Sequence, residues 1–511
     1  MYKRENKQQT ELDFSEFFLP FGGKLDSENR WIQLSNLIPW DDVEETYAEQ
    51  FGTTGNAAKN LRMALGSLII KERLGLTDRE TVEQIRENPY LQYFLGYKTY
   101  IDEKPFDPSL FVYFRKRFRK KILSQINETI TRKALEEEKT KDNRKSNDDD
   151  DPPEDETGNN RGKLLVDATC TPADITFPTD LKLLNTAREK SQKIIDILHC
   201  PFIGKQKKPR TYRRIARKAF LSAAKSKKLS TSKRRKALRK QLGYLKRNLE
   251  SIEKLSHQTS LLRLKPRQYK DLLVIHEVYR QQKWMYDHRE SRIDDRIVSI
   301  SQPHVRPIKR GKAGASTEFG AKVSASLIDG YSFVDHISWN AFNEAGDLID
   351  QIETYRKRFS YYPASVHADK IYRTRENRRY CKKHGIRLSG PPLGRPPAQV
   401  EKQRKIRLQS RRDELDRIPI EGKFGQGKRR FSLSRIMCKL AVTSETAITI
   451  AFVVMNLEKW LKSHFFAYFL CSMVVNSIAS EVKTRFLSYK RQYALSLIKL
   501  PNARIWYLSQ I

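Results

Sequence analysis

Two acidic residues that lie far apart in the chain end short apolar runs. Asp167 closes the run Leu-Leu-Val-Asp, and Asp369 closes the run Val-His-Ala-Asp. A short apolar run of this kind predicts a buried strand, so we expect each carboxylate at the C-terminal end of its strand. Because such aspartates often only cap the next helix, each acid alone is a weak signal.

A third acid, Glu421, lies in a segment that contradicts its own helix preference. The segment Arg417-Ile-Pro-Ile-Glu421-Gly-Lys-Phe-Gly-Gln-Gly-Lys428 holds three glycines, and each weakens a helix by roughly 0.8–1.0 kcal/mol relative to alanine. Proline suits the first helical position, so we expect a helix to begin at Pro419, with Arg417 before it. Segments that break local rules are often functional. Taken alone, Glu421 is better explained as a capping residue on a surface helix.

Together the three acids predict metal-dependent phosphoryl transfer. Acids at the ends of neighbouring strands converge, and a helix laid across the sheet can bring a third. Carboxylates this close repel one another, so cations must neutralise them. Hard oxygen ligands suit Mg²⁺, with Mn²⁺ as a substitute, and two ions about 3.5–4 Å apart can hold the attacking and leaving oxygens of a phosphodiester. The expected reaction is in-line attack on DNA phosphorus by water or a 3′-hydroxyl.

These acids and their contexts resemble the bacterial insertion-sequence transposases that have an RNase H-like core and a DDE triad. The resemblance covers most of the chain, from the helical segment 31–118 to residue 461. In that family the first Asp ends strand one, which Asp167 matches. The second Asp stands in a D-x-x-Tyr context, which Asp369 and Tyr372 match.

The glutamate of that family belongs to a signature of the form Y-x2-R-x3-E-x6-K. Arg417, Glu421 and Lys428 keep this spacing, but Glu414 occupies the tyrosine position. The resemblance implies that Arg417 and Lys428 grip phosphates beside the scissile bond, as charge-assisted clamps do. It does not say what replaces the tyrosine.

Other residues near the triad are candidates for DNA contact, namely Lys322, Tyr372, Arg373 and Lys423. For Lys322 and Arg373, ordinary solvated charges are an equal alternative. His367 shares a strand face with Asp369, which would suit a general base. A structural role is favoured for it, since metal-bound water needs no such base.

Composition points to a polyanionic partner. The 511 residues carry 98 Lys+Arg against 61 Asp+Glu, a net charge of +37, which favours nucleic acid over a membrane surface. The five cysteines form no C-x-x-C pair, which favours a reducing compartment. No secretory signal is visible, and the apolar run 465–479 is shorter than the ~20 residues a membrane span needs. We therefore expect a bacterial cytoplasmic protein associated with the nucleoid.

The predicted fold is an α/β RNase H-like catalytic core, a mixed sheet flanked by helices, with an all-α N-terminal domain and a basic helical insertion. The expected segments are a helical domain for DNA binding or dimerisation (1–135), an acidic disordered linker (136–162), the start of the core (163–196), the insertion (197–305), the rest of the core (306–461) and a helical tail (462–511). Alternation around Asp329-Gly330 predicts a β-hairpin. The insertion has no carboxylate between residues 197 and 249, which favours phosphate contact.

The sequence therefore predicts a transposase that cuts the ends of its element and joins the 3′-hydroxyl ends to target DNA. Its partners would be double-stranded DNA, at terminal inverted repeats and target, and, by resemblance, a second copy in a homodimeric synaptic complex. No membrane partner is expected. The alternatives are a structure-selective DNA nuclease on the same core and an inactive, transposase-derived DNA-binding protein.

Overall fold

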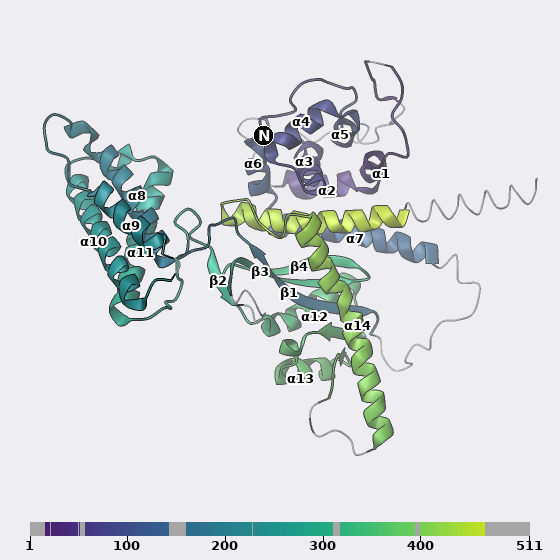
Figure 1. Cartoon of the computed structure of the whole chain (residues 1–511). Helices are drawn as coiled ribbons and strands as arrows, with labels where there is room; N and C mark the ends of the chain where they lie inside the picture. The colour runs from purple at the N-terminus through teal and green to yellow at the C-terminus, as the bar shows by residue number, and fades with distance from the viewer. Residues whose placement is uncertain are drawn as a thin grey trace, which may run out of the picture.

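A mixed β-sheet forms the centre of the molecule (Figure 1). The computed structural model describes residues 16–20, 22–49, 51, 57–142, 160–226, 228–309, 317–392, 394 and 399–464. Within these residues the sheet has six strands, β1 (Lys163–Pro172), β2 (Arg306–Lys309), β3 (Thr317–Ile328), β4 (Tyr331–Ser338), β5 (Ser365–Ala368) and β6 (Arg387–Leu388). Strand β3 pairs antiparallel with β1, β2 and β4, whereas β5 runs parallel to β1 and β6.

The predicted hairpin is confirmed as β3–β4. Ile328 pairs with Tyr331, so only two residues form the turn. Both have positive φ, 48° at Asp329 and 79° at Gly330, as a two-residue turn matched to the strand twist requires.

Strand β1 is longer than its apolar run predicts, so Asp167 lies in mid-strand rather than at the strand end. Residues 168–172 continue the ladder with β3, from Ala168 opposite Ser324 to Pro172 opposite Gly320. The β-branched residues of this stretch favour an extended backbone. Because this stretch contains polar side chains, the apolar run that predicted the strand ended before it.

The N-terminal helices share one hydrophobic core with the sheet. They are α1 (Arg30–Leu37), α2 (Trp40–Ala48), α3 (Leu61–Leu74), α4 (Asp78–Glu87), α5 (Pro89–Phe94), α6 (Leu110–Arg117) and α7 (Lys120–Asp142). Phe111, Phe114 and Phe118 are fully buried in this core. They are therefore packing residues.

The first residues of the expected acidic linker are helical. Helix α7 continues to Asp142, because two of its acids have partners in the core. Tyr331 donates a hydrogen bond to Glu138 at 2.7 Å, and Trp460 donates one to Glu137 at 3.1 Å. The prediction that residues 136–142 are disordered is therefore wrong, and 143–159 lie outside the described residues.

A long apolar helix, Ala441–His464, lies between the sheet and the N-terminal helices (yellow in Figure 1). It is long and apolar enough to cross a membrane, but 78% of its most apolar window is buried inside the protein. That burial identifies a core helix. The predicted buried helix at 465–479 lies outside the described residues.

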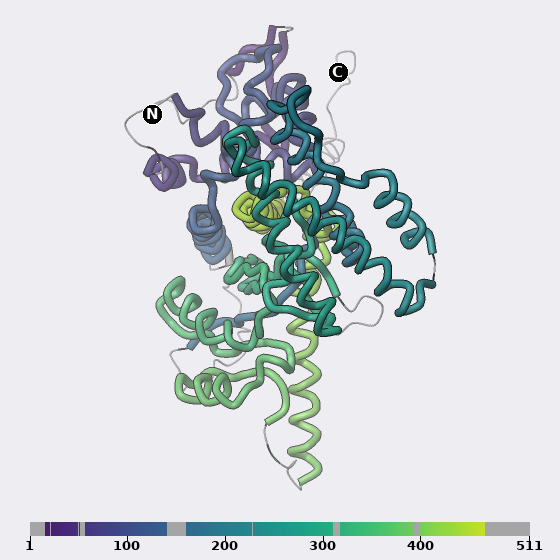
Figure 2. The backbone as a smooth tube through the Cα atoms, turned by 90° about the vertical axis from the view of Figure 1, so that its left-hand side faces the viewer, coloured from purple at the N-terminus to yellow at the C-terminus, as the bar shows by residue number. Residues whose placement is uncertain are grey.

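The insertion is a helical bundle that stands beside the sheet (teal in Figures 1 and 2). It consists of α8 (Asp180–His199), α9 (Arg213–Ala224), α10 (Thr231–Ser256) and α11 (Pro266–His288), and it has a hydrophobic core of its own. Helix α8 belongs to this bundle, since its apolar face, including Leu184 and Ile195, packs there. The insertion therefore begins before residue 197, contrary to the predicted boundary.

Three further helices lie around the parallel part of the sheet, α12 (Leu348–Phe359), α13 (Arg375–Lys383) and α14 (Val400–Arg430). Pro419 lies inside α14, so the expected start there is wrong and Arg417 is on the helix, not before it. An internal proline costs a helix about 3 kcal/mol. Packing offsets that cost here, because Ile420, Phe424 and Gly427 of the same helix are buried.

Candidate active site

The first two acids of the predicted triad stand level on adjacent parallel strands. Val166 of β1 pairs with Ala368 of β5, and the next residue along each segment is the acid. Asp369 directly follows β5, and its carboxylate accepts a hydrogen bond from the Lys370 backbone N–H at 2.6 Å. The register of the parallel pair thus places Asp167 and Asp369 at the same point of the sheet.

Helix α14 adds the third acid through Arg417. The Arg417 guanidinium lies 2.8 Å from Oε1 of Glu421, one turn further along the helix, and 3.8 Å from Oδ2 of Asp167. One cation therefore bridges the carboxylate of β1 and that of α14. The Glu421 side chain is half exposed, whereas that of Asp167 is largely buried.

The pKa of Asp167 is raised mainly because its carboxyl group is buried. Burial raises the pKa of Asp167 to about 6, and the nearby carboxylates of Glu344 and Asp369 contribute to that rise. The Ala168 backbone N–H, 2.8 Å from Oδ1, and the Arg417 guanidinium lower the pKa without cancelling the effect. A carboxylate with a raised pKa is one that added cations would stabilise.

Glu344 is a fourth acid at this site that the sequence analysis missed. It begins the short 3-10 helix Glu344–Asp347, between β4 and α12, and Lys322 of β3 pairs with it at 2.9 Å. Lys322 also donates to the carbonyl of Phe342 at 2.8 Å. In the sequence, Glu344 stands out only as an acid between the predicted hairpin and the next helix. Many acids with a purely structural role occupy such a position, so Glu344 could not be identified from the sequence.

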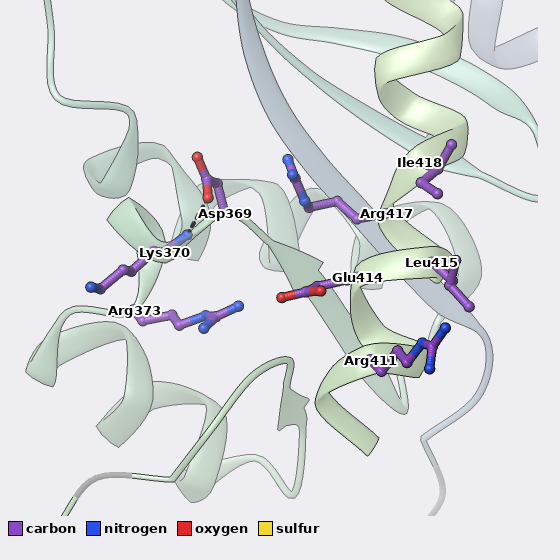
Figure 3. A pocket seen from close by; sticks show the side chains of 8 residues that line it. All are labelled: Asp369, Lys370, Arg373, Arg411, Glu414, Leu415, Arg417 and Ile418. Atoms are coloured by element: carbon purple, nitrogen blue, oxygen red, sulfur yellow. Dashed lines mark hydrogen bonds between the residues drawn. The ribbon is translucent and has the colours of Figure 1, made fainter. Parts of the chain in front are cut away.

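An open pocket of about 500 Å³ lies between Asp369 and α14. It is lined by Asp369, Lys370, Arg373, Arg411, Glu414, Leu415, Arg417 and Ile418 (Figure 3). Glu414, at the signature's tyrosine position, points from α14 toward Arg373 (Figure 3). Four cations against two carboxylates give the pocket the charge balance expected of a phosphate-binding surface.

The other predicted DNA contacts lie in different surroundings. Tyr372 is fully buried beneath the site, and Lys428 lies two turns beyond Glu421 on α14. Lys423 is partly buried near Lys459 and Lys462 of the last helix, and burial lowers its pKa to about 8. The pocket therefore includes Arg417 and Arg373 of the predicted set, and it does not include Lys423.

His367 of β5 lies against α14 and has a structural role, which is the role favoured for it from the sequence. Its ring is fully buried, with the Ser365 hydroxyl 3.0 Å from Nε2. Two carboxylates of α14, Asp413 and Asp416, lie 3.8 and 3.9 Å from its ring nitrogens. Asp413 in turn accepts hydrogen bonds from Arg387 of β6 at 2.8 and 3.0 Å. These contacts fix α14 to β5 and β6 one turn before Arg417.

Within the described residues, His367, Asp413 and Asp416 are the group whose ligand atoms lie within 4.8 Å of one another and could hold a metal ion. Such a mixed set of nitrogen and oxygen donors suits a transition metal, although Asp413 is already paired with Arg387. Asp167, Asp369 and Glu421 do not form a group that close, and they offer only carboxylate oxygens, the donors that Mg²⁺ prefers.

Comparison with known proteins supports an insertion-sequence DDE transposase. A family model described as a transposase DDE domain matches residues 366–458, a range that includes two of the three acids. A second, described as a transposase domain (DUF772), matches residues 20–117 in the N-terminal helices. The resemblance proposed from the sequence is thereby confirmed, and a transposase domain implies DNA binding and a nuclease or transposase class of enzyme.

A relative with a partial match is an uncharacterized protein of Rhizobium meliloti, ORF8 in the nfe locus. It is 29% identical over 156 residues, which is 30% of this chain. The match covers 66% of the relative, just under two thirds of its length. No solved structure matches the chain.

Proposed function

We propose that the chain is a transposase that cuts the ends of its insertion sequence and joins the freed 3′-hydroxyl ends to target DNA. The observation that supports this proposal is the level placement of Asp167 in β1 and Asp369 after β5, with Arg417 of α14 lying between the carboxylates of Asp167 and Glu421. The topology agrees with an RNase H-like core, because a long antiparallel hairpin flanks a first strand that continues into parallel neighbours.

The three carboxylates would hold divalent ions, Mg²⁺ or Mn²⁺. When bound, such ions neutralise the phosphate and activate the attacking oxygen. The role of the chain is then to place the DNA. Arg417 and Arg373 line the pocket beside Asp369, where their guanidinium groups can bind a phosphate with two hydrogen bonds each. Lys322 offsets the charge of Glu344.

The partners follow from the reaction. Double-stranded DNA would be bound at the terminal repeats and at the target, and two ends would be brought together by two copies of the chain. A bacterial cytoplasmic location, at the nucleoid, is part of the proposal.

Cleavage of a duplex that carries the gene's own flanking ends, with Mg²⁺, tests the proposal. The native chain is compared with Glu421→Gln and with Glu401→Gln, a control at the exposed start of the same helix. We expect nicks at the element boundary from the native and control chains. Loss of one metal-binding carboxylate should reduce the Glu421→Gln rate at least 100-fold, since removal of a single group that stabilises the transition state costs roughly this much in other enzymes.

The other outcomes each select an alternative. DNA binding without nicks in any chain would indicate a DNA-binding protein with an inactive triad. Cutting unrelated to the element boundary would indicate a nuclease without strand transfer. Equal cutting by Glu421→Gln and the native chain would rule out the triad.

A further inference from the structure

Part of the helical bundle projects past the bundle's own core. The fully buried residues of α10 all lie at or after Gln241. Among residues 231–240, only Leu238 packs against the bundle core, and it is partly buried. Helix α9 buries only Ala216, whose carbonyl accepts a hydrogen bond from Gln241 at 3.1 Å. We call α9 and residues 231–240 the basic arm.

The charge of the basic arm is almost uncompensated. Four lysines or arginines lie on α9 and six lie in residues 231–240, and neither segment contains an acid. Within the described part of the chain, Arg213 alone among these ten has an ion pair, with Asp196. Arg235 lies 4.1 Å from the centre of the Tyr286 ring. Most of the others are exposed.

The sequence of the arm places like charges next to one another. Residues four apart on a helix are neighbours, so Arg214 repels Lys218, and Lys236 repels Lys240. A helix as short as α9 is marginal in water without packing, and this one buries a single alanine. A polyanion would replace this repulsion with attraction along the whole arm.

Duplex DNA fits this surface better than the other polyanions. Binding of single strands depends on exposed aromatic rings on which bases stack. Residues 231–240 contain no aromatic residue, and the one aromatic residue of α9, Phe220, is partly buried. An anionic membrane would require a broad apolar face, whereas the apolar side chains exposed on α9 are Ile215 and Leu221. The ten residues 231–240 span about 15 Å and the twelve residues of α9 span about 18 Å, enough for each segment to reach neighbouring phosphates of a duplex.

We propose that the basic arm is a sequence-independent clamp for the backbone of duplex DNA, a role that rests on the proposed transposase function. The bundle stands on the side of the sheet away from α14 (Figure 1), so the arm holds DNA at a distance from the scissile phosphate. Such a contact adds affinity and salt dependence without adding sequence preference.

The test removes four charges from the arm of the full chain and measures duplex binding against salt. The arm variant carries Lys233→Gln, Arg234→Gln, Lys236→Gln and Arg239→Gln. We expect the slope of log Kd against log salt to fall by roughly 3–4, at about 0.9 for each phosphate that the arm no longer neutralises. Affinity should fall at least 10-fold, and the cutting rate at saturating DNA should stay within twofold of the native rate. The circular dichroism of the variant should match the native spectrum, because neutral glutamines relieve repulsion.

A matched control removes the same charge from the opposite end of α10 and the start of α11. It carries Lys254→Gln, Arg263→Gln, Lys265→Gln and Arg267→Gln, all at exposed positions. Its slope should stay within about one of the native value. Equal slopes for the arm and control variants would overturn the proposal, as would an arm that binds duplex RNA or anionic vesicles more tightly than DNA.

The same assay separates this proposal from the proposed function. Glu421→Gln should bind DNA with the native slope and not cut it. If the native chain binds through the arm but never cuts, the transposase reaction fails while the clamp stands. If the native chain cuts and the arm variant keeps its slope, only the clamp fails.

Discussion

The surroundings of Asp167 determine how metal binding at the proposed site should depend on pH. Its carboxylate is buried beside two further acids and one arginine, and burial is the main reason that its pKa rises to about 6. A group of this kind is neutral in mildly acidic solution and is therefore a poor metal ligand there. The cleavage reaction should accordingly be lost on the acid side, as protonation of Asp167 competes with metal binding.

Replacement of Glu344 should move that acid limit. Glu344 raises the pKa of Asp167 by charge repulsion, so Glu344→Gln should lower that pKa and shift the acid limb of the rate–pH profile to lower pH. Metal affinity should also fall severalfold, because one negative charge leaves the site. The measurements are cleavage rates between about pH 5 and 8, the range that brackets this titration, and Mn²⁺ binding to the chain without DNA.

Asp350→Asn is the matched control for this experiment, since it removes an exposed acid six residues further along the chain. Its profile should overlay the native one. A shift of the Glu344→Gln limb to higher pH would contradict the proposed repulsion.

Helix α14 is the element that decides whether the site forms. It carries Arg417 and Glu421, and its contact with His367 and Arg387 fixes it to the sheet through Asp413. The spacing of its charged residues could be read from the sequence, because it depends only on the positions of a few side chains. The start of α14 at Val400 could not be read from the sequence, since a proline is normally excluded from a helix interior and Pro419 was therefore placed at the first helical position.

Other features could be predicted when they depend on neighbouring residues and could not be predicted when they depend on distant parts of the chain. The β3–β4 hairpin was predictable because its turn chemistry is local to Asp329 and Gly330. The length of β1 depends on its partner β3, and the membership of α8 in the bundle depends on helices that come later in the chain. Glu344 reaches the site only through the fold, so no local pattern marks it.

Helix α3 contains a buried acid, Glu72. Burial raises the pKa of Glu72 to about 7, against the nearby positive charges of Lys71 and Arg115, which lower it. The protonated form therefore favours folding. This stabilisation is complete below pH 4.5 and is lost as pH rises through 7.

Glu72→Gln should remove this pH dependence. We expect the variant to be more stable than the native chain by about 2–3 kcal/mol at about pH 8.5 and to differ little from it at about pH 4. Urea unfolding at the two pH values measures the difference. The exposed Glu80→Gln of the next helix should show no such contrast, and an equal effect at both pH values would assign the change to packing.

Across the whole molecule, one core joins segments from both ends of the described chain. Asn456 of the last helix shows how tightly they are joined. Its side chain accepts a hydrogen bond from the Ser332 backbone N–H at 2.9 Å and donates to the Ser332 carbonyl at 2.8 Å. It also donates to Asn127 of α7 at 2.9 Å. Three distant segments thus depend on one buried amide.

Asn456→Leu should destabilise the whole chain and not one part of it. The change leaves buried groups of Ser332 and Asn127 without partners, which costs about 1–3 kcal/mol each. We expect the sheet and the N-terminal helices to lose stability together, by about 2–5 kcal/mol in sum. Hydrogen exchange on both regions is the measurement, and Ser463→Ala near the end of the same helix is the control. Destabilisation confined to the last helix would show that the core is not cooperative.

The late position of helix Ala441–His464 in the chain delays completion of the hydrophobic core during synthesis. The N-terminal helices leave the ribosome early, but the surface that covers their core is made only near the end of the described chain. At about 5–20 residues per second, the 322 residues from Asp142 to His464 take roughly 15–65 s. Between the synthesis of residue 240 and that of Glu421, the nascent chain carries the basic arm without the third acid, so it can attach to DNA before it can cut. Chaperones that cover exposed apolar surface should therefore bind this chain early and release it only when its last helix is made.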